Sequence, residues 1–158
     1  MKLPPDFREL LEEFAREQVH SVIIGGYAVG FHARPRATKD LDVVLQGNPD
    51  NLERAARALR RFGAPHEVVE ATRDLAEDEV VYLGQPPLRI DLLRSVEGLV
   101  TDDLFERAVT GTWDGLPIRV IALDDLITNK RAVGRPQDLA DVAVLERARR
   151  RLRDRGAR

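Results

Sequence analysis

Two aspartates, Asp40 and Asp42, flank Leu41 at the start of a short apolar run. Side chains alternate between the two faces of a β-strand, so both carboxylates would project to one side and Leu41 to the other. Two carboxylates about 7 Å apart along a strand can lean together onto one or two divalent cations. The alternative is that two solvated acids simply mark the start of a strand.

A third acid, Asp91, lies in the apolar run from Leu88 to Leu93. An aspartate inside such a strand is disfavoured unless it is paired or bound to a ligand. Arg89 is two residues away on the same face of the strand and could neutralise Asp91. If this strand neighbours the strand of Asp40 and Asp42, three carboxylates converge into a hard-oxygen site suited to Mg²⁺ or Mn²⁺.

The glycine pair Gly25-Gly26 ends a β-branched run and precedes a possible short helix. This order of elements presents bare backbone N–H groups at a helix N-terminus, an arrangement that binds phosphate. A tight turn is the structural alternative. The sequence has neither the Gly-Lys-Ser/Thr of a P-loop nor the Gly-x-Gly-x-x-Gly of a dinucleotide-binding fold.

Three further residues are candidates for contacts with a triphosphate: Thr38, Lys39 and Lys130. Thr38 and Lys39 adjoin the acid pair, and their alternative role is to shape the loop. Lys130 falls on a predicted helix, where its side chain either faces the triphosphate or is exposed to solvent. Lysine carries a compact point charge that suits phosphate.

Two acids near the C-terminus, Asp138 and Asp141, share one helix face, and we interpret both as structural. An acid in the first turn of a helix, such as Asp138, is stabilised by the helix dipole. Trp113 could stack on a base or cover the edge of a sheet. The three histidines are scattered along the sequence, and we propose no zinc site.

The hydrophobic periodicity predicts an α/β (α+β) domain in which helices pack on a twisted mixed sheet. Helices are expected over residues 7–18, 27–32, 51–62, 101–109, 123–133 and 136–153, and Thr101 is expected to cap the fourth of them. Strands are expected over residues 20–24, 41–45, 66–70, 79–83, 88–93 and 116–122. Residues 84–87 are expected to join two of these strands as a hairpin.

The composition describes a soluble globular protein: 158 residues, 43% hydrophobic, with a net charge of −2. Residues 1–158 are expected to form one domain, with C-terminal helices from about residue 123. There is no cysteine and no apolar run long enough for a membrane helix, which favours a cytoplasmic protein. Seven arginines lie in the last fourteen residues, so the tail 147–158 is either a solvated helix end or a basic arm for RNA or an acidic partner.

Taken together, these segments make the sequence similar to the nucleotidyltransferase superfamily related to DNA polymerase beta, and most similar to its minimal abortive-infection and toxin–antitoxin type members. The resemblance rests on residues 22–29, 36–44, 89–93, 126–131 and 134–141. It implies that Asp40 and Asp42 bind metal ions and that Asp91 completes the site where the acceptor hydroxyl is deprotonated. It also implies that Gly25 and Gly26 hold the β- and γ-phosphates. Many relatives have a serine where this chain has Gly26.

We therefore predict an enzyme that uses Mg²⁺ or Mn²⁺ to move a nucleoside monophosphate from a nucleoside triphosphate to an acceptor hydroxyl. The acceptor could be an RNA end, a protein or a small molecule. The chain leaves little room for an acceptor-binding domain, so a partner chain or self-association is expected. The alternatives are a non-catalytic nucleotide-binding or antitoxin-like interaction protein with the same fold, and an RNA-binding module led by the arginine tail.

Overall fold

A six-stranded mixed sheet with the strand order β3-β4-β2-β1-β6-β5 forms the centre of the protein. The computed structural model describes residues 2–157. The strands are β1 (Ser21–Ile24), β2 (Asp40–Leu45), β3 (Val80–Leu83), β4 (Arg89–Leu93), β5 (Val109–Trp113) and β6 (Leu116–Val120). The pairs β2–β4 and β1–β6 are parallel, while β1–β2, β3–β4 and β5–β6 are antiparallel. The predicted fold class, an α/β domain with a mixed sheet, is confirmed.

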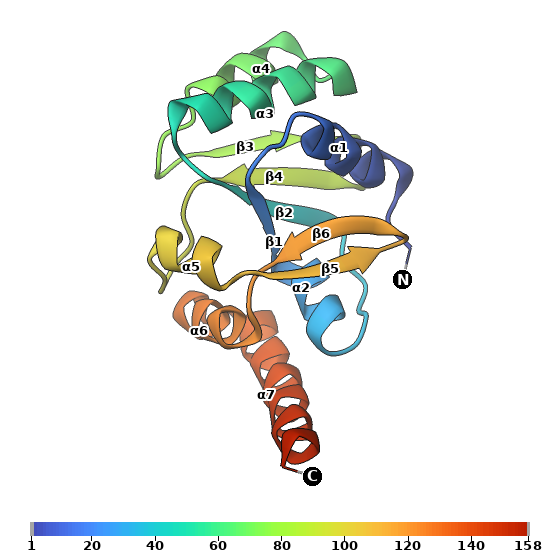
Figure 1. Cartoon of the computed structure of the whole chain (residues 1–158), viewed down its shortest axis with the longest axis vertical. Coiled ribbons are helices and arrows are strands. Elements are labelled where there is room, and N and C mark those ends of the chain that lie inside the picture. The colour runs from blue at the N-terminus through green and yellow to red at the C-terminus, as the bar shows by residue number, and fades with distance from the viewer. Residues whose placement is uncertain (1, 158) are drawn as a thin grey trace.

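Seven helices surround the sheet within the described residues: α1 (Pro5–Arg16), α2 (Gly25–His32), α3 (Pro49–Phe62), α4 (His66–Arg73), α5 (Thr101–Arg107), α6 (Leu123–Val133) and α7 (Pro136–Gly156). In the view of Figure 1, α1, α3 and α4 gather above the sheet, and α2, α5, α6 and α7 lie below it. The long helix α7 begins beside α6 and ends away from the body. The helix packs against α6 and α2, and its last residues, 151–157, are exposed.

The central strands are apolar on both faces, and their side chains form the core. Leu41, Val43 and Val44 of β2 are fully buried, as are Ile90 and Leu92 of β4. Strands that are buried on both sides read as continuous apolar runs, as the sequence of β2 does after Asp42. β2 and β4 are parallel neighbours, so the polar residues that begin them, Asp40 and Arg89, lie at the same end of the two strands.

The predicted strand over residues 66–70 is wrong, because these residues form the first turns of α4. The β-branched pair Val68-Val69 suggested a strand. The buried residues of this segment, however, are Val69 and Thr72, whose spacing of three is that of a helix packed on one side. Pro65 lies directly before the helix, where a fixed φ suits helix initiation. Packing of α4 against α3 overrides the local strand preference.

The sequence analysis also missed β5, because it extended the preceding helix to Val109. Helix α5 ends at Arg107, and residues 109–113 pair with β6 as a hairpin in which Trp113 faces Leu116. The two turn residues, Asp114 and Gly115, both have positive φ, of 52° and 77°. Asp-Gly is favoured at such turns, so the signal was present in the sequence. Thr101 is not the cap of α5: the N-cap residue is Val100, and the Thr101 hydroxyl donates to the backbone oxygen of Arg94.

Candidate functional site

A cavity of about 370 Å³ opens where β1 and β2 meet the helices α6 and α7. The end of β1 and the start of α2 contribute Gly25 and Gly26, and β2 contributes Asp40 and Asp42. The helices contribute cationic and acidic groups, among them Lys130. Residues that are far apart in the sequence and carry the predicted chemistry thus line one space.

The parallel pairing of β2 and β4 brings the three predicted carboxylates together. Asp42 stands in register with Asp91, and Asp40 stands in register with Arg89. Asp91 is 7% exposed and is not among the residues that line the cavity. Asp91 and Asp42 nevertheless lie close enough to share a hydrogen bond. The predicted neighbourhood of the two strands is therefore observed.

Arg89 neutralises Asp91, as the alternative interpretation of the sequence anticipated. Its Nε lies 2.7 Å from Oδ1 of Asp91 and its Nη2 lies 3.0 Å from Oδ2. The same Nη2 is 3.5 Å from Oδ2 of Asp40, and the guanidinium stacks 4.8 Å over the ring of Tyr82. A carboxylate offers about four lone-pair directions, so this two-point contact leaves acceptor capacity on Asp91.

Asp42 is the electrostatically strained member of the group. Burial raises its pKa to about 7, and the charges of Asp91 and Asp40 and the hydrogen bond with Asp91 act in the same direction. Lys130 opposes the shift. A buried carboxylate beside two others is poorly compensated by the protein alone, and a bound cation would supply the missing charge.

The glycine turn lies directly against this carboxylate. Gly25 has a φ of +69°, and a Cβ atom placed on it would lie 2.2 Å from Oδ2 of Asp42. A Cβ atom on Gly26 would lie 2.9 Å from the Thr38 hydroxyl oxygen and 3.1 Å from Nη2 of Arg36. Both positions therefore need glycine for close approach. The space that a serine side chain would enter at position 26 is already filled, in part by the hydroxyl of Thr38.

Lys130 is buried rather than solvent-exposed, and it is held by two acids of α7. Its Nζ lies 3.0 Å from Oδ1 of Asp138 and 3.1 Å from Oδ2 of Asp141. Nε of Arg135 lies 2.7 Å from Oδ2 of Asp138. Arg36 donates two hydrogen bonds to the carboxylate of Asp141, from Nε at 3.0 Å and from Nη2 at 2.9 Å. The two acids are thus structural, as predicted, and they fix three cations around the cavity.

The electrostatics of this network favour its charged form. Burial alone would raise the pKa of Asp138, but hydrogen bonds from Arg135 and Lys130 outweigh burial and lower the pKa to about 2. The side chains of Asp138 and Asp141 are only 1% and 3% exposed. The cations and acids of the network therefore neutralise one another within the protein.

A family model described as nucleotidyl transferase of unknown function (DUF2204) matches residues 5–155. The chain belongs to this nucleotidyl transferase family. The match includes every residue that lines the cavity. A search of curated protein sequences gives no significant match.

Solved structures of nucleotidyltransferases have the fold of this family member. The lincosamide antibiotic adenylyltransferase LnuA, solved with lincomycin, is 12% identical with a TM-score of 0.57, covering 92% of this chain and 97% of its own. ANT(2'')-Ia in complex with adenylyl-2''-tobramycin is 13% identical with a TM-score of 0.59, covering 94% and 95%. A putative nucleotidyltransferase from Thermotoga maritima is 14% identical with a TM-score of 0.54, covering 94% and 91%.

Of the remaining predicted contact residues of this nucleotidyl transferase family member, some line the cavity and others do not. Thr38 lines the cavity, and its hydroxyl lies 3.3 Å from the backbone oxygen of Asp40. Lys39 is exposed and does not line the cavity. Trp113 is buried and packs with its ring centroid 5.3 Å from that of Tyr27, which favours the second of its two alternatives, a cover over the edge of the sheet.

Two cavity residues, Arg36 and Arg135, were missed by the sequence analysis. Twenty-two arginines in the chain gave neither residue a distinctive signal. The available clue was spacing, because Arg135 stands three residues before Asp138 at the start of α7, where the two form a reciprocal cap. Arg36 pairs with an acid 105 positions away, which no local pattern indicates.

Across residues 2–157, no three acidic, histidine or cysteine side chains are placed to hold one metal ion together. The set Asp40, Asp42 and Asp91 therefore remains a prediction. Its donor chemistry suits Mg²⁺ or Mn²⁺, because all six oxygens are hard ligands and Asp42 lacks a full counter-charge.

In the same part of the chain, no helix is long and apolar enough to cross a membrane.

Proposed function

We propose that the protein moves a nucleoside monophosphate from a nucleoside triphosphate to an acceptor hydroxyl, with a divalent cation held by Asp40, Asp42 and Asp91. One observation carries the proposal: Asp42, which stands in register with Asp91, lies so close to Gly25 that a Cβ atom there would be 2.2 Å from its Oδ2. Carboxylates and bare backbone amides at one place suit a cation and a phosphate chain bound together.

The triphosphate would lie along the Gly25-Gly26 turn at the N-terminus of α2. Its phosphate oxygens would accept hydrogen bonds from the backbone N–H groups there and from the Thr38 hydroxyl. Arg36, Lys130 and Arg135 would balance the negative charge, since all three line the cavity. The proposal does not use Lys39, because that side chain is exposed outside the cavity.

In the reaction, the acceptor hydroxyl oxygen forms a bond to the α-phosphorus. The bond from this phosphorus to the α,β-bridging oxygen breaks, and pyrophosphate leaves with the bonding electrons. The hydroxyl proton passes to Asp91, whose carboxylate keeps lone pairs that Arg89 does not use. A bound divalent cation would supply neutralisation of the charge that develops on the phosphate and leaving oxygens.

The acceptor is the hydroxyl of an RNA end, a protein or a small molecule. LnuA and ANT(2'')-Ia are an antibiotic adenylyltransferase and a protein bound to an adenylylated tobramycin, so small molecules with free hydroxyls belong in any screen. A second copy of the chain or a partner would complete the acceptor side. Incubation with labelled triphosphates, magnesium and these three acceptor classes identifies the product.

The decisive comparison uses Asp42→Asn and Asp91→Asn against Asp78→Asn, an exposed acid elsewhere on the surface. We expect the first two variants to lose labelling by about 100-fold or more and the control to retain it. Equal labelling by all four proteins, or labelling that persists in excess chelator, would refute the proposal.

A second candidate function, nucleotide binding without turnover, is favoured by one observation: Arg89 already occupies two oxygens of Asp91. In that case Arg89 would stand in for a cation. Calorimetry on wild type and Arg89→Gln separates the candidates. An enzyme binds triphosphate with magnesium and turns it over, and Arg89→Gln changes the rate. A binding protein shows no turnover in either form and binds triphosphate without metal.

A further inference from the structure

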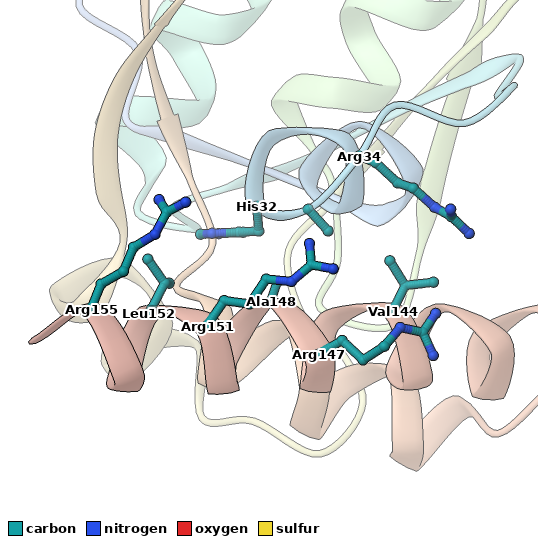
Figure 2. A pocket seen from close by; sticks show the side chains of 9 residues that line it. His32, Arg34, Val144, Arg147, Ala148, Arg151, Leu152 and Arg155 are labelled. Carbon is teal, nitrogen blue, oxygen red and sulfur yellow. The ribbon is translucent and has the colours of Figure 1, made fainter. Parts of the chain in front are cut away.

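A second cavity, of about 250 Å³, lies between the end of α2 and the last turns of α7. Its cationic wall consists of Arg34, Arg147, Arg151 and Arg155, and we call this cavity the arginine groove. Figure 2 shows the arginines of α7 lined up along the helix, with Arg34 reaching over from the loop after α2. Among the residues that the structure describes, no aspartate or glutamate lines the groove.

The four guanidiniums of the groove have no anionic partner in the part of the chain that the structure describes. None of them forms an ion pair or a side-chain hydrogen bond there. Other arginines of this protein, such as Arg73 and Arg107, do pair with acids. Four like charges facing one groove repel one another, so the groove is best stabilised by a ligand with several negative charges.

The spacing of the charges selects among polyanions. Arg147, Arg151 and Arg155 are four residues apart, so they repeat on one helix face with a rise of about 6 Å per step. A phosphodiester backbone presents anions at regular intervals of similar size, whereas carboxylates on a protein surface have no fixed interval. Guanidinium also matches phosphate in a two-point geometry.

The floor of the groove suits nucleobases. Val144, Ala148 and Leu152 form an apolar strip between the arginines, and the large side chain of Leu152 is 57% exposed. The His32 ring also lines the groove and is fixed by its Nε2, 2.6 Å from the backbone oxygen of Ile121. In single-strand binding sites, unpaired bases stack on aromatic rings and guanidinium planes, which His32 and the arginines supply here, and the apolar strip adds contact area beside them.

We propose that the arginine groove binds single-stranded RNA, with phosphates on the guanidiniums and bases over the apolar strip. A groove of this volume takes one or two bases. Unpaired polynucleotide is the usual state of RNA loops and ends, which favours RNA over DNA. The inference concerns binding and does not depend on turnover in the nucleotidyl transfer cavity.

The test is fluorescence anisotropy with a labelled oligouridylate and the full chain. Four phosphate contacts predict that the logarithm of the binding constant falls linearly with the logarithm of the salt concentration, with a slope of about −3. The double variant Arg147→Ala/Arg151→Ala should bind about ten-fold more weakly and lower the slope by about one to two. The matched control is Arg150→Ala/Arg153→Ala, which removes the same charge from the same helix outside the groove.

Equal losses in the two double variants would overturn the proposal, because binding would then be diffuse attraction to a basic helix. Binding of poly-glutamate as tightly as of oligouridylate would also overturn it and point to an acidic protein partner. Tighter binding of the matching deoxy-oligonucleotide would replace RNA with DNA as the ligand. Circular dichroism of each variant confirms that the helix remains folded, as expected for exposed, unpaired arginines.

Discussion

The two ends of α7 use charge in opposite ways. At its start, Asp138 and Asp141 are buried and hold Lys130, while arginines close the network from outside. At its end, Arg147, Arg151 and Arg155 face solvent and have no anionic partner among the described residues. Paired cations in a buried network have a fixed geometry and position a site, whereas unpaired cations remain available to a ligand. The role of a charged residue in this protein therefore depends on its partners rather than on its type.

The largest effect should come from removing the central cation of the buried network. Lys130→Met leaves two carboxylates under-compensated in a buried place, and we expect a loss of about 3 kcal/mol in the free energy of unfolding. Equilibrium unfolding in denaturant measures this loss in the free energy of unfolding. The matched control is Lys39→Met, whose side chain is exposed. Similar stability of both variants would show that the network contributes little.

A smaller effect of opposite sign is expected from Asp42→Asn in metal-free protein. Burial and its acidic neighbours raise the pKa of Asp42 from 3.8 to about 7, so ionised Asp42 destabilises the fold. This penalty is absent below pH 3.8, grows as the pH rises, and is complete above the folded-state pKa. Asp42→Asn should therefore stabilise the protein by more than about 1 kcal/mol at neutral to alkaline pH and by little in acid.

Thermal unfolding across this pH range in chelator measures the Asp42 effect, with Asp78→Asn as the control. Magnesium should reverse the ranking by stabilising wild type alone. A variant that is less stable than wild type at every pH would mean that the carboxylate has a partner in the folded state. The proposed cation site would then lose its electrostatic basis.

The smallest effect on stability belongs to the arginine groove. Arg147→Ala/Arg151→Ala removes no ion pair formed within residues 2–157, so its free energy of unfolding should stay within about 0.5 kcal/mol of wild type. Chemical denaturation in the absence of RNA measures this. A loss as large as that of Lys130→Met would remove the distinction between the two ends of α7.

Local patterns in the sequence predicted most elements, and tertiary packing explains the failures. Helix α6 was predicted with its bounds because Gly134, with a φ of +70°, ends it and apolar spacing defines its face. The segment 66–70 carried a valine pair typical of strands, yet its contacts with α3 made it a helix. The residues around Val68 and Val69 in the sequence do not indicate that this segment packs against α3, so the error results from tertiary context.

The candidate site was predictable where its residues lie on adjacent strands. Alternation along β2 and the apolar setting of Asp91 indicated a shared carboxylate site. The register of β2 and β4 confirms that Asp42 and Asp91 are neighbours. The partners Arg36 and Asp141 were not predictable as a pair, because their contact joins a loop to a distant helix. The buried state of Lys130 was missed for the same reason, since its two acids lie across the junction of α6 and α7.

The loop after α2 places Arg34 in the groove and Arg36 in the cavity lined by Asp40 and Asp42, with only Pro35 between them. The ring of Pro35 fixes its own φ, so the segment between the two arginines has fewer backbone conformations than another residue would allow. If a triphosphate alters the affinity for RNA by some factor, RNA must alter the affinity for triphosphate by the same factor. The span 34–36 joins the arginine groove to the cavity proposed to bind triphosphate, and any coupling between the two obeys this equality.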